Sequence, residues 1–191
     1  MADVDAGKAA IVRELLPEVE LVEDAELRDK VIEVWVRAWE LSGFARFEDG
    51  MMMGKSLRDS QAGLAHIRAT ARLSIDAART LRDTFGFQIH VDYVAAGALL
   101  HDVCKQVEYI EPAAGTFRGD VLHHSITGAH LALQAGLPPE VAHIVAYHSA
   151  LGDSVERSFE CVLVHSVDEV MADAVYRRFL GKSRRQLHSG R

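Results

Sequence analysis

Apolar residues recur at helical spacing along nearly the whole chain of 191 residues, and no run alternates as a half-buried strand would. In residues 25–42 they fall on one helical face, and Gly43 follows where a helix end favours glycine. The same reasoning predicts further helices, bounded by glycine and proline, at about 60–84, 92–109, 121–135, a short one ending near 147, and 157–180. The chain is therefore expected to be all-α, a bundle of about five core helices with an N-terminal helical extension.

Length and composition agree with this organisation. Hydrophobic residues make up 49% and charged residues 26% of the chain, as in ordinary globular proteins. The predicted division is an N-terminal extension with a connecting loop (1–58), a helical domain (59–180) and a basic C-terminal tail (181–191). The extension and the methionines at 51–53 could form a lid or a homodimer interface. Cys104 and Cys161 lack the spacing of a disulfide framework, which favours a reduced, intracellular setting.

Charge and hydropathy exclude some classes of partner. No stretch approaches the roughly 20 apolar residues that span a bilayer, and the N-terminus lacks a secretory signal, so a cytoplasmic protein outside the membrane is expected. The net charge of −7 argues against nucleic acid, because phosphate backbones bind clustered Lys and Arg. The basic residues near the C-terminus are interpreted as a solvated helix end: Arg177, Arg178, Lys182, Arg184, Arg185 and Arg191.

Histidine is the unusual component, with 10 residues that lie mostly between 66 and 165. Several of them, and two aspartates, stand in apolar stretches, where a buried ionisable group is costly unless it is paired or binds metal. They are His66, His101, Asp102, His124, His148 and Asp168. Each one alone fits a satisfied core histidine or a capped aspartate. Five predicted helices that each contribute such a residue favour a shared site.

The order His, His-Asp, His, His, Asp along successive helices resembles the two-metal branch of the HD superfamily. The resemblance is carried by residues 98–105, 124–129, 146–148 and 167–168, and it covers roughly 60–175. It implies an HD domain in which His66, His101, Asp102 and Asp168 hold one metal ion. It also implies that His124 and His148 hold a second ion, with Asp102 bridging the two. Four imidazoles and two carboxylates suit Fe²⁺ or Mn²⁺ best, with Zn²⁺, Co²⁺ or Ni²⁺ as further options.

Helical geometry separates other histidines from these candidates. At 3.6 residues per turn, His130 lies about 240° from His124, and His143 about 140° from His148. His123 is one residue out of the family register. These three are predicted at the surface or behind the ligands.

Two divalent ions would bring a charge of +4 against −2 from the aspartates, and the surplus would bind an anion and activate water. Lys105 lies three and four residues after Asp102 and His101, and the resemblance implies that it binds phosphate. Arg118, in a glycine-flanked loop, is a second candidate for phosphate binding. His165 stands one turn before the aspartate of the last helix and could orient a ligand or shuttle protons. Asp102, Lys105 and His165 are the predicted catalytic residues.

The predicted function is hydrolysis of a phosphoester or phosphoanhydride in a small metabolite or nucleotide, by metal-bound hydroxide. Two alternatives stay open. The same ligand set serves di-iron oxygenases of the superfamily, which oxidise a C–H bond with O₂. A non-catalytic ligand sensor on a retained scaffold is the other.

Overall fold

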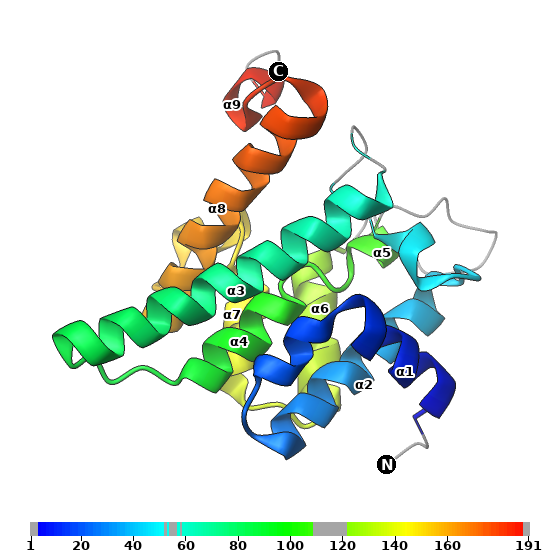
Figure 1. Ribbon diagram of the computed structural model, residues 1–191, viewed down its shortest axis with the longest axis horizontal. Coiled ribbons are helices and arrows are strands. Elements are labelled where there is room, and N and C mark those ends of the chain that lie inside the picture. The colour runs from blue at the N-terminus through cyan, green and yellow to red at the C-terminus, as the bar shows by residue number, and fades with distance from the viewer. Residues whose placement is uncertain (1–3, 52, 54–56, 58, 109–121, 189–191) are drawn as a thin grey trace.

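A computed structural model describes residues 4–51, 53, 57, 59–108 and 122–188. Within these residues the regular structure is helical, which confirms the predicted all-α fold (Figure 1). The α-helices are α1 (Ala6–Leu15), α2 (Ala25–Ser42), α3 (Ser60–Phe85), α4 (Val91–Leu100), α5 (Lys105–Glu108), α6 (His124–Gln134), α7 (Pro139–Tyr147), α8 (Phe159–Leu180) and α9 (Arg184–His188). Short 3₁₀ turns are η1 (Pro17–Leu21), η2 (Phe47–Gly50) and η3 (Ala150–Ser154). In this described part, no helix is both long enough and apolar enough to cross a membrane.

Capping side chains and glycines set the ends of the two longest helices, α3 and α8. The Asp59 carboxylate accepts two backbone N–H groups of the first turn of α3, at 2.9 and 3.2 Å. Ser158 Oγ does the same for one N–H group of α8, at 3.2 Å. Gly86 and Gly181 end these helices with φ values of 70° and 66°, a left-handed conformation that glycine adopts without strain.

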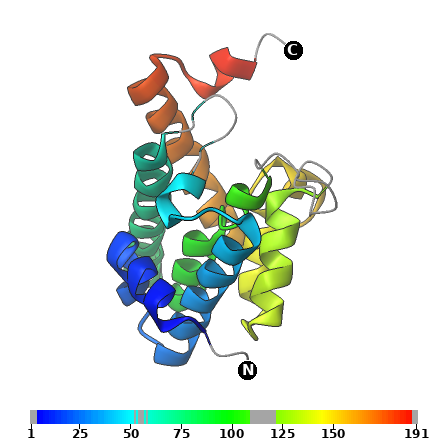
Figure 2. The ribbon, with the colours of Figure 1, turned by 90° about the vertical axis from the view of Figure 1, so that its right-hand side faces the viewer.

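α4 is the central helix and lies between the α3–α8 pair and the α6–α7 pair (Figures 1 and 2). Its residues from Val94 to Leu100 are all buried. Gly97 permits a close approach to α7, because a Cβ there would lie 2.5 Å from Ile144 Cγ2. The crossing brings together the residues that follow each helix, so that the rings of His101 and His148 have centroids 5.1 Å apart.

The N-terminal helices share the apolar core of the bundle. Val12 of α1, Val19 of η1 and Trp35 of α2 are fully buried in one cluster with Leu99 of α4. The Trp35 indole packs edge-on against the Phe47 ring, with 5.5 Å between centroids. Residues 4–51 therefore contribute directly to the support of α4.

The structure differs from the prediction at the helix expected over 92–109. α4 ends at Leu100, and residues 101–104 form turns before α5 begins. The Val103 N–H donates to Leu100 O at 3.1 Å and the Lys105 N–H to Asp102 O at 3.0 Å, the spacing of a tighter turn than an α-helix. The apolar run continues through this break, so periodicity does not reveal it.

Other boundaries shift by a few residues. α6 begins at His124 and α8 at Phe159, slightly later than predicted. The predicted loop that contains Gly115, Arg118 and Gly119 lies outside the described residues.

Candidate metal centre

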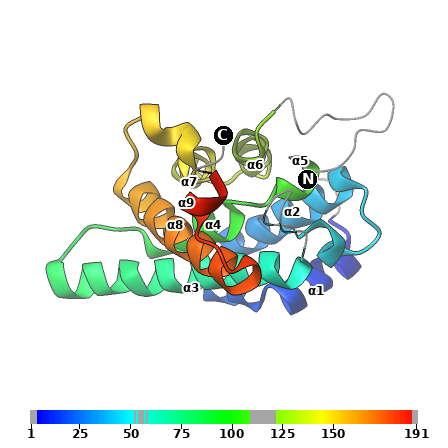
Figure 3. The same cartoon turned by 90° about the horizontal axis from the view of Figure 1, so that it is seen from above.

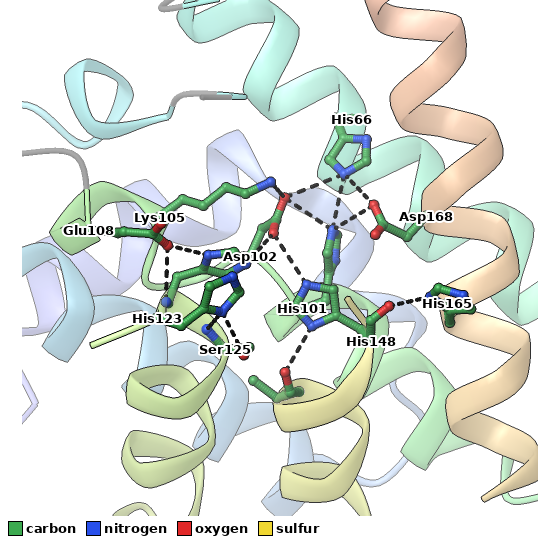
Figure 4. Close-up of polar contacts among 12 residues, drawn as sticks. His66, His101, Asp102, Lys105, Glu108, His123, Ser125, His148, His165 and Asp168 are labelled. Atoms are coloured by element: carbon green, nitrogen blue, oxygen red, sulfur yellow. Dashed lines mark hydrogen bonds and ion pairs between the residues drawn. The ribbon is translucent and has the colours of Figure 1, made fainter. Parts of the chain in front are cut away.

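Six buried side chains meet where α4 ends (Figure 4). None of the six is more than 8% exposed. They are His66 of α3, His101 and Asp102 of the turn after α4, His124 of α6, His148 directly after α7, and Asp168 of α8. The residues singled out as candidate metal ligands are thus close together in space.

Their donor atoms fall into two groups, each with all atoms within 4.8 Å of one another. The first group is His66, His101 and Asp168, and the second is Asp102, His124 and His148. Asp102 Oδ2 lies 3.4 Å from His66 Nε2 and 3.3 Å from His101 Nε2. Asp102 Oδ1 lies 3.3 Å from His124 Nε2 and 3.6 Å from His148 Nε2. A carboxylate with one oxygen directed at each group has the geometry of a bridging ligand.

Three of these histidines form a hydrogen bond within the protein through Nδ1. His101 and His148 donate Nδ1–H to the carbonyl oxygen three residues earlier, at 2.7 and 2.8 Å. His124 Nδ1 donates to the Glu108 carboxylate, which also accepts the His124 backbone N–H at 3.0 Å. A proton on Nδ1 leaves a lone pair on Nε2 of the neutral ring, and each of these Nε2 atoms faces Asp102. Partners of this kind fix the tautomer and orientation of metal-binding histidines.

Buried nitrogen and oxygen atoms without hydrogen-bond partners support a cation at this point. Within the described residues, the buried Asp102 Oδ1 and His124 Nε2 have no hydrogen-bond partner. His66 Nε2 and His101 Nε2 face each other at 3.0 Å. Buried nitrogen lone pairs and carboxylate oxygens that converge in this way fit a divalent transition metal.

The electrostatic environment favours the metal-binding forms of Asp102 and His148. Burial raises the pKa of Asp102, but Lys105 and the neighbouring histidines outweigh this effect and hold that pKa well below its usual range. Burial dominates at His148 and lowers its pKa to about 4. Burial also lowers the pKa of His66 and His124, but the neighbouring carboxylates outweigh this effect and raise the pKa of both rings. Asp102 is therefore ionised and His148 neutral near pH 7, as metal binding requires.

A cavity of about 280 Å³ adjoins the second group. Its wall includes Lys105, His124, His148, Asp168, Tyr176 and Arg184. Lys105 reaches it from α5, with Nζ 2.5 Å from Asp102 Oδ2 (Figure 4). A positive charge is thus present beside the candidate ligands.

His165, predicted as a catalytic residue, contacts the main chain beside a candidate ligand. Its Nδ1 donates to the His148 carbonyl oxygen at 2.5 Å (Figure 4), and His165 is absent from the described wall of the cavity. This contact ties α8 to the end of α7 and supports a positioning role. Arg118, predicted to bind substrate, lies outside the described residues.

Three further histidines are outside the set of candidate ligands, although the His123 ring lies beside that of His124, with 4.1 Å between the centroids. His123 caps the start of α6 through its ring and lines the cavity. His143 Nε2 accepts the backbone N–H of the residue that caps α8, at 3.1 Å. His130 is exposed.

Glu108 and Arg184 are residues of the site that were not identified from the sequence. Glu108 follows Lys105 by three residues, a spacing that is ordinary for a surface carboxylate, so the sequence carries no local signal of its contact with His124. Arg184 belongs to the basic tail that was interpreted as solvated. That interpretation is wrong for Arg184, which lines the cavity and forms an ion pair with Glu169.

Comparison with known proteins agrees with the geometry. A family model described as HD domain matches residues 63–173, more than half of the chain. The chain is also 29% identical over 172 residues to a protein of Methanocaldococcus jannaschii named dihydroneopterin 2',3'-cyclic phosphate phosphodiesterase. That alignment covers 81% of this chain and 66% of the relative, so the chain spans slightly less than two thirds of the relative's length. No solved structure gives a significant match. The matched span contains all six converging side chains, and the chain belongs to the HD domain family.

Proposed function

We propose that this chain is a metal-dependent phosphohydrolase with a dinuclear centre, acting on a small phosphorylated metabolite or nucleotide. The observation that carries the proposal is the pair of buried donor groups joined by Asp102. Membership of the HD family and the name of the archaeal relative support the class of reaction. One ion would be held by His66, His101 and Asp168, the other by His124 and His148, and both by Asp102.

The described residues suit the proposed chemistry. When bound, two divalent metal ions supply Lewis acidity and activate water for attack on phosphorus. The protein orients three of the four imidazoles through Glu108 and backbone carbonyls, which keeps the Nε2 atoms of His101, His124 and His148 directed into the site. Lys105 places a positive charge where the transferring phosphoryl group gains negative charge, and such fixed charges stabilise a transition state.

The proposed substrate class is a small phosphodiester. The archaeal relative is named for a cyclic phosphate, which is a phosphodiester. The cavity of about 280 Å³ is near the lower end of ligand pockets, roughly 300–1,000 Å³. A small ester fits this space better than a polymer does.

The test begins with anaerobic purification and elemental analysis. Hydrolysis of bis(p-nitrophenyl) phosphate and of nucleoside 2',3'-cyclic monophosphates is then measured with Mn²⁺, Fe²⁺ or Co²⁺. We expect two metal ions per chain and ester cleavage without O₂, because hydrolysis needs no change of metal oxidation state.

The alternatives give different results in the same experiment. Strict dependence on iron and O₂, with no ester cleaved, would contradict the proposal in favour of an oxygenase. A protein that binds no divalent metal would contradict it in favour of a ligand sensor.

A further inference from the structure

The residues after α8 fold back towards the cavity. Gly181 turns the chain, and Ser183 and Gln186 then begin α9 with reciprocal hydrogen bonds of 2.8 Å (Ser183 N–H to Gln186 Oε1) and 3.2 Å (Gln186 N–H to Ser183 Oγ). Asp173 of α8 accepts the Arg184 backbone N–H at 2.7 Å. As a result α9 lies beside the C-terminal end of α8, turned towards α6 and α7 (Figures 1 and 3).

This arrangement places Arg184 in the same cavity wall as His124, His148 and Asp168. The Arg184 side chain is 32% exposed and pairs with Glu169, which is 41% exposed. Ion pairs at such exposure contribute only about 0–1 kcal/mol. A bound anion can therefore compete with Glu169 for the guanidinium group.

The chemistry of the wall suits an anion that carries phosphate. Lys105 enters the cavity from α5 and Arg184 from α9, so cations from two separate elements border one space. Burial lowers the pKa of Arg184, but the hydrogen bond to Glu169 outweighs this effect, and the guanidinium stays charged. Its planar set of five N–H donors matches the oxygens of phosphate, often in bidentate fashion.

We propose that Arg184 binds the phosphate group of the substrate, so that α9 completes the active site. Arg184 lies beyond the span that matches the family, which ends at residue 173. The inference rests on the proposed function and names a residue that selects anionic substrates at that site.

The test uses the full chain loaded with Mn²⁺ and compares Arg184→Gln with two matched variants. Arg185→Gln removes the same charge from the exposed neighbour on α9. Glu169→Gln breaks the same ion pair but keeps the Arg184 guanidinium. Inorganic phosphate is titrated by calorimetry, and KM and kcat are measured with bis(p-nitrophenyl) phosphate.

We expect Arg184→Gln to weaken phosphate binding by about 10- to 150-fold and to raise KM more than it lowers kcat. Arg185→Gln should match the unmodified protein, and Glu169→Gln should bind phosphate at least as tightly. An equal loss in Glu169→Gln and Arg184→Gln would overturn the inference, because it would show that the ion pair only holds α9 in place. Unchanged phosphate binding in Arg184→Gln would overturn it as well. An unmodified protein that binds phosphate but cleaves no ester would contradict the proposed function alone.

Discussion

Lys105 places a positive charge beside the proposed ligands, with Nζ 2.5 Å from Asp102 Oδ2. If it also binds the substrate phosphate, Lys105→Ala removes a charge-assisted contact worth about 1.5–3 kcal/mol. That loss corresponds to a decrease of roughly 10- to 150-fold in kcat/KM. The measurement is hydrolysis of bis(p-nitrophenyl) phosphate by the Mn²⁺-loaded protein, with metal content followed in parallel.

Metal content distinguishes two roles of this lysine. Both ions should remain in Lys105→Ala if its main contact is with substrate, and Lys182→Ala, at an exposed position, serves as the control. Loss of metal together with activity would show that Lys105 acts mainly by holding Asp102.

Glu108 is expected to strengthen metal binding at the group that contains His124 and His148. Its carboxylate accepts His124 Nδ1–H, and this contact is among those that raise the pKa of His124. Glu108→Gln should weaken metal binding at the His124 and His148 group by about 10- to 100-fold, as loss of such supporting contacts does elsewhere. Competition with a chelating dye measures the affinity of each site. Glu140→Gln, an exposed position on α7, is the control, and an equal loss at both metal sites would contradict the assignment.

The proposed ligands could be predicted from the sequence because a histidine or aspartate among apolar residues has few structural explanations. Glu108 could not, because it stands where a surface carboxylate is ordinary and is separated from His124 by 16 residues along the chain. Arg184 could not, because its basic neighbours made a solvated tail the simpler interpretation. Both positions depend on tertiary contacts that no local pattern encodes.

At the scale of elements, the crossing of α4 and α7 sets the distance between His101 and His148. A Cβ at Gly97 would lie 2.5 Å from Ile144 Cγ2, whereas one at Gly128 would lie 3.0 Å from Val145 Cγ1. Gly97→Ala should therefore destabilise the fold by about 1–3 kcal/mol more than Gly128→Ala. Both substitutions gain the same helix propensity, so the difference in unfolding free energy, measured in urea, reports the crowding. Equal stability of the two variants would contradict this close contact.

A buried carboxylate joins η1 to α3. Glu18 is 1% exposed, and its carboxylate accepts hydrogen bonds from Arg68 Nε at 2.9 Å and from Arg72 Nε at 2.7 Å. Burial raises the pKa of Glu18, but the two arginines outweigh it and hold the pKa below its ordinary value of 4.5. Because the folded state has the lower pKa, the stabilisation is present above about pH 4.5 and is lost as the pH falls through the folded value.

Glu18→Gln should therefore lower the unfolding free energy by about 1–3 kcal/mol at neutral pH. The difference in unfolding free energy between the variant and the unmodified protein should become smaller in acid, where the carboxylate of the unmodified protein is protonated. Urea denaturation at several pH values measures both effects, with Glu14→Gln as an exposed control. A difference in unfolding free energy that does not change with pH would show that packing, and not charge, determines the stability loss.

The helices themselves were predictable because their apolar faces and glycine ends repeat a simple pattern. The break at residues 101–104 was not, because it lies inside a continuous apolar run and is determined by how α4 meets its neighbours. That break separates α4 from α5 and so sets the direction in which Lys105 leaves the turn. Sequence patterns therefore identify Lys105 but not the turn that positions it.

At the scale of the whole molecule, the site depends on more than the span that defines the family. The match covers residues 63–173, which contain the proposed ligands. The helices before it pack into the same core as α4, and Arg184 after it lines the cavity. The family span thus contains the proposed metal ligands, whereas the segments on either side contribute core packing and a cation in the cavity wall.

Metal binding should stabilise the whole chain, because the proposed ligands come from α3, the turn after α4, α6, the residue after α7, and α8, and must be held together. An ion present at 100 times its dissociation constant adds about 2.7 kcal/mol to the unfolding free energy. For a chain of this size, that corresponds to a rise in Tm of roughly 5–11 °C. Scanning calorimetry of the metal-free and Mn²⁺-loaded protein measures the rise. Mg²⁺ should give a smaller rise, because it prefers oxygen ligands.

Asp102→Asn and pH test whether the rise in Tm comes from this site. Asparagine cannot offer two charged oxygens, so the rise should be abolished in that variant if Asp102 bridges both ions. Protons compete with metal for the imidazoles, and the raised pKa of His66 and His124 extends that competition towards neutral pH. The rise in Tm should therefore be full in mild base, decrease through neutrality and vanish in acid. A rise that persists in Asp102→Asn, or that is the same at every pH, would show that the metal binds elsewhere on the chain.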